Sequence, residues 1–340
     1  MKVFHTADVH LTETHPERFE ALEEIVDRCE REEADLLLIT GDLFDANADL
    51  EDLKTDLRGL FSDTCFETLV IQGNHDKNVF RSEDFFGNKF QVMDNTPVDV
   101  REYENINIVG VPYTEDDFSS IIEDISESYV EGKTNVLMLH CSLTGVSGGF
   151  GGEEKYLPVR PEELIQTGFD YVLAGHIHSS ATRRTFEKTV FAYSGSPVSI
   201  SSSETGSRNI WKLNEEGLST VSLDSFHYIK QEKEMLPGEE SEKLDEIKEY
   251  VETEDVSNAS LIVKLSGFTD RNITDIKREV EAFTKNAFDS DIIIDNLESV
   301  KSITESELYS EFKEKLDDKD FEKKDKIEEK FLRGLSRSER

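Results

Sequence analysis

Five short clusters of aspartate, asparagine and histidine residues stand out in the sequence. They are Asp8-Val9-His10, Gly41-Asp42, Gly73-Asn74-His75-Asp76, His140 and Gly175-His176-Ile177-His178. Residues two positions apart in an extended chain point to the same side, so Asp8 with His10 can converge on one point. Carboxylate, amide and imidazole groups together suit manganese, iron or zinc better than calcium. The clusters therefore predict a transition-metal site.

The number of candidate ligands indicates more than one ion. They are Asp8, His10, Asp42, Asn74, His140, His176 and His178. Such a set is too large for one tetrahedral ion, but it suits two ions about 3.5 to 4 Å apart that share one carboxylate. Two ions stabilise both the attacking and the leaving oxygen in phosphoryl transfer, which predicts hydrolysis of a phosphate ester. For each pair alone, hydrogen-bonded structural histidines are the alternative.

Each cluster follows an apolar run that we predict as a strand. Strands are predicted over residues 2–6, 35–40, 68–72, 106–111, 135–140, 171–174 and 189–193. Apolar residues at helical spacing follow Pro16 and recur from Leu50 to Phe61, which predicts two helices that cover a sheet. Functional groups gather in the loops that follow such strands. The first two hundred residues therefore read as a layered α/β domain.

The composition changes from about Ser225. We expect a linker and helix over 230–248, then a strand at 261–265, a helix at 273–286 and a strand at 291–294, which together form a small α/β unit. From about Ile303, apolar residues among dense charges, interrupted at 317–320, predict two amphipathic helices without a core of their own. The predicted domains are residues 1–224, 225–298 and 299–340.

The chain is strongly acidic. It has 38 Lys and Arg against 74 Asp and Glu, a formal charge of −36, which repels a polyanion unless salt screens it. Our hypothesis is an adaptation to a salty cytoplasm. Apolar runs fall far short of the roughly 18 residues that span a membrane, and the first residues lack a signal-peptide pattern. We expect a cytoplasmic, nucleoid-associated protein that binds no membrane.

The order of the clusters resembles the calcineurin-like metallophosphoesterase superfamily, whose signature is D-x-H, G-D, G-N-H-[DE], H and G-H-x-H. The resemblance implies a four-layer α/β sandwich of two mixed sheets flanked by helices, a small α/β capping domain and C-terminal amphipathic helices. It assigns Asp8, His10, Asp42 and His178 to one ion, and Asp42, Asn74, His140 and His176 to the other. It makes His75 the catalytic histidine, a general acid or a stabiliser of developing charge.

Further sequence stretches resemble one particular family within this superfamily. FHTADVHL, GDLFD, QGNHD and AYSGSP are similar to the SbcD and Mre-eleven family of double-strand-break repair nucleases. That family implies a DNA nuclease with two Mn²⁺ ions per subunit, Mg²⁺ being less supported, with 3′ to 5′ double-strand exonuclease and single-strand endonuclease activity. It also implies homodimerisation through residues 50–61 and an SMC-like coiled-coil ATPase of the SbcC type bound by residues 299–340. Asp45 stands where the archaeal and eukaryotic branch commonly has histidine.

Two other functions are compatible with the residues. One is a phosphoesterase on the same scaffold that acts on a small phosphodiester or a phosphoprotein, because the metal site alone does not choose the substrate. The other is an inactive scaffold that recruits the ATPase. The scaffold predicts the loss of metal ligands, whereas all of them and His75 are present.

Overall fold

The computed structural model describes residues 1–46, 48, 50–77, 79–80, 85–146, 156–253, 258–284, 289–319, 321 and 323–338. The chain divides into two compact units, Met1–His227 and Tyr228–Arg340. Within the described ranges, no helix is both long and apolar enough to cross a membrane.

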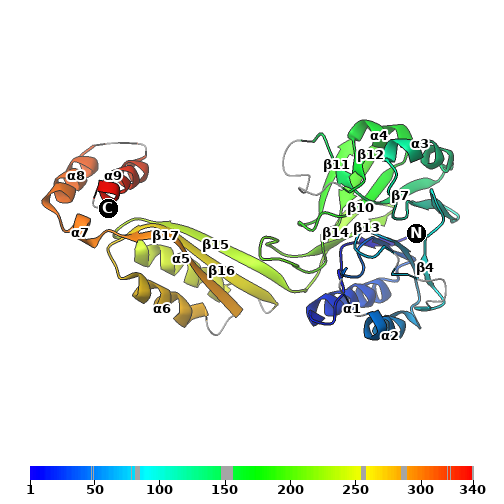
Figure 1. The fold of residues 1–340 in the computed structure, drawn as a ribbon, viewed down its shortest axis with the longest axis horizontal. Helices are drawn as coiled ribbons and strands as arrows, with labels where there is room; N and C mark the ends of the chain where they lie inside the picture. Colours follow the sequence, from blue (N-terminus) through cyan, green and yellow to red (C-terminus); the bar gives the residue numbers. More distant parts are fainter. Residues whose placement is uncertain are drawn as a thin grey trace. The chain divides into compact units, whose positions relative to one another are not determined.

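The first unit contains two mixed sheets (Figure 1). One has the order β14-β13-β1-β2-β3-β4, from β1 (Val3–Thr6), β2 (Leu36–Thr40), β3 (Glu67–Ile71), β4 (Phe90–Val92), β13 (Asn209–Asn214) and β14 (Gly217–Ser222). The other has the order β11-β12-β10-β7-β6-β5, from β5 (Asp99–Glu102), β6 (Ile106–Gly110), β7 (Thr134–His140), β10 (Tyr171–Gly175), β11 (Thr182–Phe186) and β12 (Thr189–Tyr193). Central strands pair in parallel, as β1 does with β2 and β7 with β10, and β8 (Ser142–Leu143) pairs with β9 (Pro158–Val159).

Helices cover the outer face of each sheet. α1 (Pro16–Arg31) and α2 (Leu50–Phe61) lie on the first sheet, and α3 (Phe118–Glu127) and α4 (Pro161–Thr167) on the second (Figure 1). Pro16 opens α1, where its missing N–H costs nothing. The side chains that α1 buries recur every three or four residues, as Leu22, Ile25 and Cys29 do.

The two sheets pack face to face through a shared apolar core. Leu38 and Leu69 of the first sheet belong to the same buried cluster as Val136, Met138 and Leu173 of the second. Strands buried on both faces are apolar at nearly every position, as the run LLLIT of β2 is. The predicted sandwich of two mixed sheets flanked by helices is therefore confirmed.

The second unit begins with one small sheet and two helices that share a buried apolar cluster with it. The elements are β15 (His227–Met235), α5 (Glu240–Thr253), β16 (Ala259–Thr269), α6 (Ile273–Thr284) and β17 (Asp289–Ser299), with sheet order β15-β16-β17. The expected linker at 230–235 is wrong, because this stretch is a strand whose burial alternates between Ile229 and Met235. The helix predicted over 273–286 reaches Thr284, and residues 285–288 lie outside the described ranges.

Three helices complete the described part of this unit: α7 (Lys301–Thr304), α8 (Glu307–Asp317) and α9 (Lys324–Ser338). The last two correspond to the two amphipathic helices that the sequence predicts. Tyr309 and Leu332 from these helices share one buried cluster with Leu236 and Phe268 of the α/β part. The helices thus complete a core that the α/β part begins.

Candidate metal centre

The predicted ligands lie where central strands of the two sheets end. The strands that precede them are β1 for Asp8 and His10, β2 for Asp42, β3 for Asn74 and His75, β7 for His140, and β10 for His176 and His178. Strands β1, β2 and β3 are neighbours in one sheet, and β7 and β10 are neighbours in the other. Because the two sheets pack face to face, residues from distant parts of the sequence meet at this edge.

Backbone hydrogen bonds fix the loops that carry these residues. The amide of His10 donates to the carbonyl oxygen of Asp42 at 3.0 Å. The amide of His75 donates to Oδ1 of Asp42 at 2.8 Å. The amide of His176 donates to both carboxylate oxygens of Asp8, at 2.9 and 3.0 Å. Each carboxylate therefore holds a neighbouring loop in addition to facing the centre of the site.

Several of these residues adopt the left-handed backbone conformation. The φ angles are 55° for Asp8, 51° for His10, 52° for Asp42 and 95° for His176. This conformation is uncommon for residues other than glycine, and it costs on the order of 1 to 3 kcal/mol at each position. Such strain is typical of functional sites, where the surrounding contacts impose it.

Two glycines make room for the ligands themselves. A Cβ atom at Gly73 would lie 2.2 Å from Oδ1 of Asp42, and one at Gly175 would lie 2.2 Å from the carbonyl oxygen of Thr40. Glycine is the residue type that permits this approach. Close packing against the neighbouring loops therefore requires glycine at Gly73 and Gly175.

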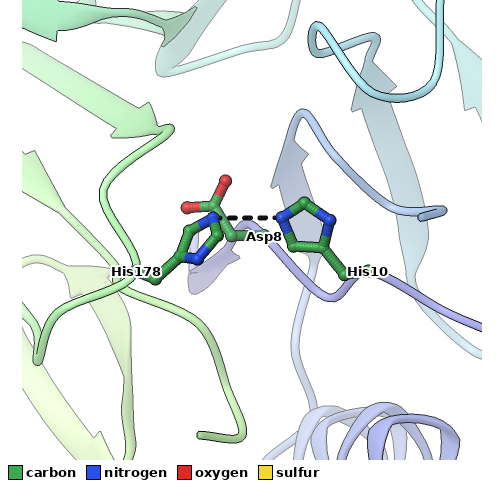
Figure 2. Close-up of side chains that lie close together, drawn as sticks. All are labelled: Asp8, His10 and His178. Atoms are coloured by element: carbon green, nitrogen blue, oxygen red, sulfur yellow. Dashed lines mark hydrogen bonds between the residues drawn. The ribbon is translucent and has the colours of Figure 1, made fainter. Parts of the chain in front are cut away.

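The side chains form two overlapping groups with metal-ligand spacing. Asp8, His10 and His178 make one group, and Asp8, Asp42 and His140 make the other, with the ligand atoms of each group within 4.8 Å of one another. The Nε2 atoms of His10 and His178 lie 3.1 Å apart (Figure 2). Asp42 Oδ2 lies 3.2 Å from Nε2 of His140 and 3.7 Å from Nε2 of His10. The Asp42 carboxylate thus lies between the two groups.

The remaining predicted residues border these groups. Oδ1 of Asn74 is 3.1 Å from Nε2 of His140. The His176 ring lies edge-on to the His140 ring, with centroids 5.2 Å apart, but outside the two groups. The His75 ring lies edge-on to the His10 ring at 4.9 Å, and its buried Nδ1 has no hydrogen-bond partner among the described residues. The structure therefore brings all the predicted site residues to one place.

Burial and charge shift the pKa values of the central groups. Burial opposes the charged form of His140, but the carboxylates of Asp42 and Asp8 raise its pKa to about 9. Burial alone would raise the pKa of Asp42, yet its charge interaction and hydrogen bond with His140 hold that pKa below its usual range. Burial and the neighbouring His178 lower the pKa of His10 to about 3. Burial raises the pKa of Asp8.

The donor set fits divalent metal ions. Asp8 and Asp42 are fully buried carboxylates, and buried charges are stable only when paired or bound to a metal. Imidazole nitrogens and an amide oxygen surround them, a mixture that suits manganese, iron or zinc. Asp8 belongs to both groups, and Asp42 lies near His140 and His10, so both carboxylates are close to the two candidate ion positions.

Asp76, the last residue of the Gly73-Asn74-His75-Asp76 cluster, accepts hydrogen bonds from the amides of Gly73 (2.6 Å) and Leu43 (2.8 Å), which joins two ligand loops. The structure also places two residues at the site that the sequence did not single out. Tyr156 lies beside His140, with ring centroids 5.7 Å apart. Glu204 lies 3.5 Å from Nδ1 of His178. No spacing pattern connects these residues to the motifs, so only the fold reveals them.

Asp45, in the loop that follows β2, contacts a buried arginine. Its Oδ2 lies 3.4 Å from the buried guanidinium of Arg18. Arg18 in turn donates to the carbonyl oxygen of His10 at 2.7 Å. Asp45 thus helps to hold the backbone of the first ligand loop.

Known proteins resemble the first unit. A sequence model of calcineurin-like phosphoesterases matches residues 1–180, a range that includes His178, the last candidate ligand. A solved structure from Thermus thermophilus is similar at 13% identity and a TM-score of 0.43, over 65% of this chain and 98% of that one. A dimetal phosphatase from Danio rerio is similar at 10% identity and a TM-score of 0.43, over 62% of this chain and 91% of that one.

Proposed function

This chain belongs to the calcineurin-like phosphoesterase family, and from that premise we propose that it is a manganese-dependent DNA nuclease that processes ends in double-strand-break repair. The family implies metal-dependent hydrolysis of phosphate esters with two divalent ions. The observation that carries the proposal is the convergence of Asp8, His10, Asp42, His140 and His178 at one edge of the sandwich. That set of side chains suits metal ions.

The residues of this chain have distinct roles in the proposed reaction. When bound, two ions supply Lewis-acid stabilisation of the phosphate oxygens. Asp42 joins the two ligand groups, and its Oδ1 also accepts the amide hydrogen of His75, which fixes that loop. The His75 ring borders the ligand group at His10. From this position an imidazole can donate a proton to the leaving oxygen or stabilise its charge.

An aromatic pair beside the ligands supports a nucleic-acid substrate. The rings of Tyr113 and Tyr156 stack with an interplanar angle of 5° and centroids 5.4 Å apart. The Tyr156 ring is 6.1 Å from the His176 ring, and its hydroxyl accepts from the amide of Thr114 at 3.0 Å. Lys77 lies 5.3 Å from the Tyr113 ring centre. Aromatic rings for bases and a cation for phosphates are what single-stranded DNA requires.

The resemblance to repair nucleases extends the proposal to activity and partners. We infer 3′ to 5′ exonuclease activity on duplex ends and endonuclease activity on single strands. We also infer a homodimer through α2. Beside this helix lies Phe85, which is 55% exposed and whose carbonyl oxygen accepts a 2.8 Å hydrogen bond from Arg58 of α2. The segment from 299 binds an SMC-like coiled-coil ATPase in this proposal, and Leu308, 54% exposed there, is available for such a contact.

The experiment that tests the function compares substrates. Purified protein with Mn²⁺ is incubated with end-labelled duplex DNA, single-stranded DNA, a small aryl phosphodiester and a phosphopeptide, at low and at molar salt. The proposal predicts DNA cleavage that exceeds hydrolysis of the small ester and of the phosphopeptide. Because the chain carries a charge of −36, cleavage should persist or increase in molar salt. Hydrolysis of the small ester or the phosphopeptide without cleavage of DNA would contradict the proposal.

A further inference from the structure

Glu204 contacts the candidate metal centre from a loop that follows β12. Its Oε1 lies 3.5 Å from Nδ1 of His178, and only 12% of its side chain is exposed. The other ring nitrogen of His178, Nε2, faces His10 (Figure 2). The imidazole of His178 therefore has one nitrogen toward the ligand group and the other toward a buried carboxylate.

The loop holds the Glu204 carboxylate in a fixed orientation. One oxygen, Oε2, accepts a hydrogen bond from the amide of Ile200 at 2.9 Å. The other, Oε1, accepts from the hydroxyl of Ser201 at 3.1 Å. The backbone carbonyl of Glu204 accepts from the hydroxyl of Ser199 at 2.6 Å. A carboxylate with these partners cannot turn away from His178 without losing hydrogen bonds.

A buried arginine ties the same loop to the backbone of His178. Arg208 is completely buried. It donates to the carbonyl oxygens of Ser196 (3.0 Å) and Glu204 (3.4 Å), and to the carbonyl oxygen of His178 itself. A buried guanidinium is costly unless its donors are satisfied. Both the side chain and the backbone of His178 are therefore held from one loop.

His140, the ligand histidine of the second group, has a backbone carbonyl rather than a carboxylate as the hydrogen-bond partner behind its ring. Nδ1 of His140 lies 3.0 Å from the carbonyl oxygen of Thr40, and its Nε2 faces Asn74 and Asp42. Carboxylates and carbonyl oxygens behind a ligand histidine both fix its ring and tautomer and raise its basicity. A negatively charged partner raises the basicity of the imidazole more strongly than a neutral one. His178 and His140 therefore differ in the partner behind the ring.

We propose that Glu204 is a positioning residue of the metal centre, which fixes the orientation and tautomer of His178 so that Nε2 binds the ion held with Asp8 and His10. This inference rests on the proposed metal-dependent function. It assigns Glu204 no contact with substrate. Its consequence is that Glu204 controls the occupancy of one ion position and leaves the position at His140 unchanged.

Calorimetric titration of the full chain with Mn²⁺ tests this inference. The variants are Glu204→Gln, which keeps the shape and removes the charge, and Glu216→Gln, a matched control in the exposed turn between β13 and β14. Wild type and Glu216→Gln should bind two ions alike. Glu204→Gln should bind one ion normally and the other about 10- to 100-fold more weakly. With saturating Mn²⁺ its kcat should recover, with KM for DNA unchanged throughout.

Each outcome of the titration decides a separate point. If wild type binds two ions and Glu204→Gln binds both equally well, the positioning role is wrong and the proposed function stands. If wild type binds no divalent ion, the proposed function fails and this inference fails with it. Metal-free Glu204→Gln could unfold at a lower temperature than metal-free wild type. In that case Ser201→Ala, which removes one hydrogen bond to Oε1 of Glu204, is titrated instead. Weaker binding at one position in that variant supports the role, and wild-type binding overturns it.

Discussion

The Nε2 atoms of His10 and His178 lie 3.1 Å apart although 168 residues separate them. A neutral imidazole carries a proton on one nitrogen and a lone pair on the other. Two lone pairs at this distance repel each other, so the pair needs a shared proton or a cation. Burial and His178 lower the pKa of His10 to about 3, which disfavours protonation of His10. Without a metal the two nitrogens can share one proton as a hydrogen bond, and a bound metal ion can take up both lone pairs in its place, which leads to predictions about that ion.

Mn²⁺ should bind more tightly as the pH rises. The pKa of His140 is about 9 in the metal-free site because Asp42 and Asp8 outweigh the effect of burial. Its proton is held below that pH and must leave when a metal binds. Affinity should therefore increase about tenfold per pH unit between about pH 6 and pH 9. Calorimetry in buffers of different ionisation enthalpy should detect release of at least one proton per chain near neutral pH. Affinity that does not change with pH would refute this assignment.

Replacing Asp76 with asparagine should separate two ligand loops. Each carboxylate oxygen of Asp76 accepts one buried amide hydrogen, from Gly73 and from Leu43. Asparagine offers one acceptor and turns an NH₂ group toward the other amide. A buried donor left unpaired costs about 1 to 3 kcal/mol. Denaturant unfolding should show a loss of this size, and Mn²⁺ binding should weaken. Asp116→Asn, at an exposed position, should change neither quantity, and equal behaviour of the two variants would oppose the proposed role.

A methyl group at Gly73 should disrupt the centre. The added Cβ would lie 2.2 Å from Oδ1 of Asp42 and 2.5 Å from its backbone nitrogen, so the residue between the two ligand groups must move. Gly73→Ala should therefore lose Mn²⁺ binding and activity. Gly59→Ala is the matched control, because a Cβ there meets no atom within 4 Å and the position lies in α2. That control should be stabilised by roughly 0.5 to 1 kcal/mol. Normal metal binding by Gly73→Ala would contradict the close packing seen at this loop.

Tyr156 should affect binding of DNA more than the chemical step. Its ring stacks on Tyr113 beside the ligand histidines. Loss of one base-stacking contact costs about 1 to 3 kcal/mol, or roughly 5- to 150-fold in affinity. Tyr156→Leu should raise KM for single-stranded DNA by a factor in this range, with Mn²⁺ binding unchanged. The control is Tyr129→Leu, because the wild-type Tyr129 ring lies against Phe169 rather than beside the ligand histidines. A change in kcat alone would remove Tyr156 from substrate binding.

The sequence predicts the parts of the site that depend on local patterns. Apolar runs such as that of β2 identify strands, and the residues that follow them, such as Asp8 and Asp42, identify the ligand loops. The packing of one sheet on the other makes these loops meet, because β1 and β10 carry their motifs to the same edge. The ligand loops therefore meet because of the fold, and the order of the motifs along the chain already indicates that fold.

Other features depend on contacts that no local pattern encodes. Glu204 reaches His178 from a loop that the buried Arg208 ties to the backbone of His178. The strand β15 was expected as a linker because its charged residues dominate the composition, while only the alternating burial of its apolar positions reveals the strand. Long-range hydrogen bonds place Glu204 beside His178, and pairing at the edge of the small sheet makes β15 a strand.

In the proposed function, a metal centre assembled by the motif residues cleaves DNA with the help of His75. The most direct measurement is cleavage of end-labelled duplex DNA by wild type and His75→Ala, each shown by calorimetry to be loaded with Mn²⁺. His75 borders His10 without belonging to either ligand group, so the variant should still bind two ions but cleave at least about 100-fold more slowly. Undiminished cleavage by metal-loaded His75→Ala, or no Mn²⁺-dependent cleavage by wild type, would contradict the account.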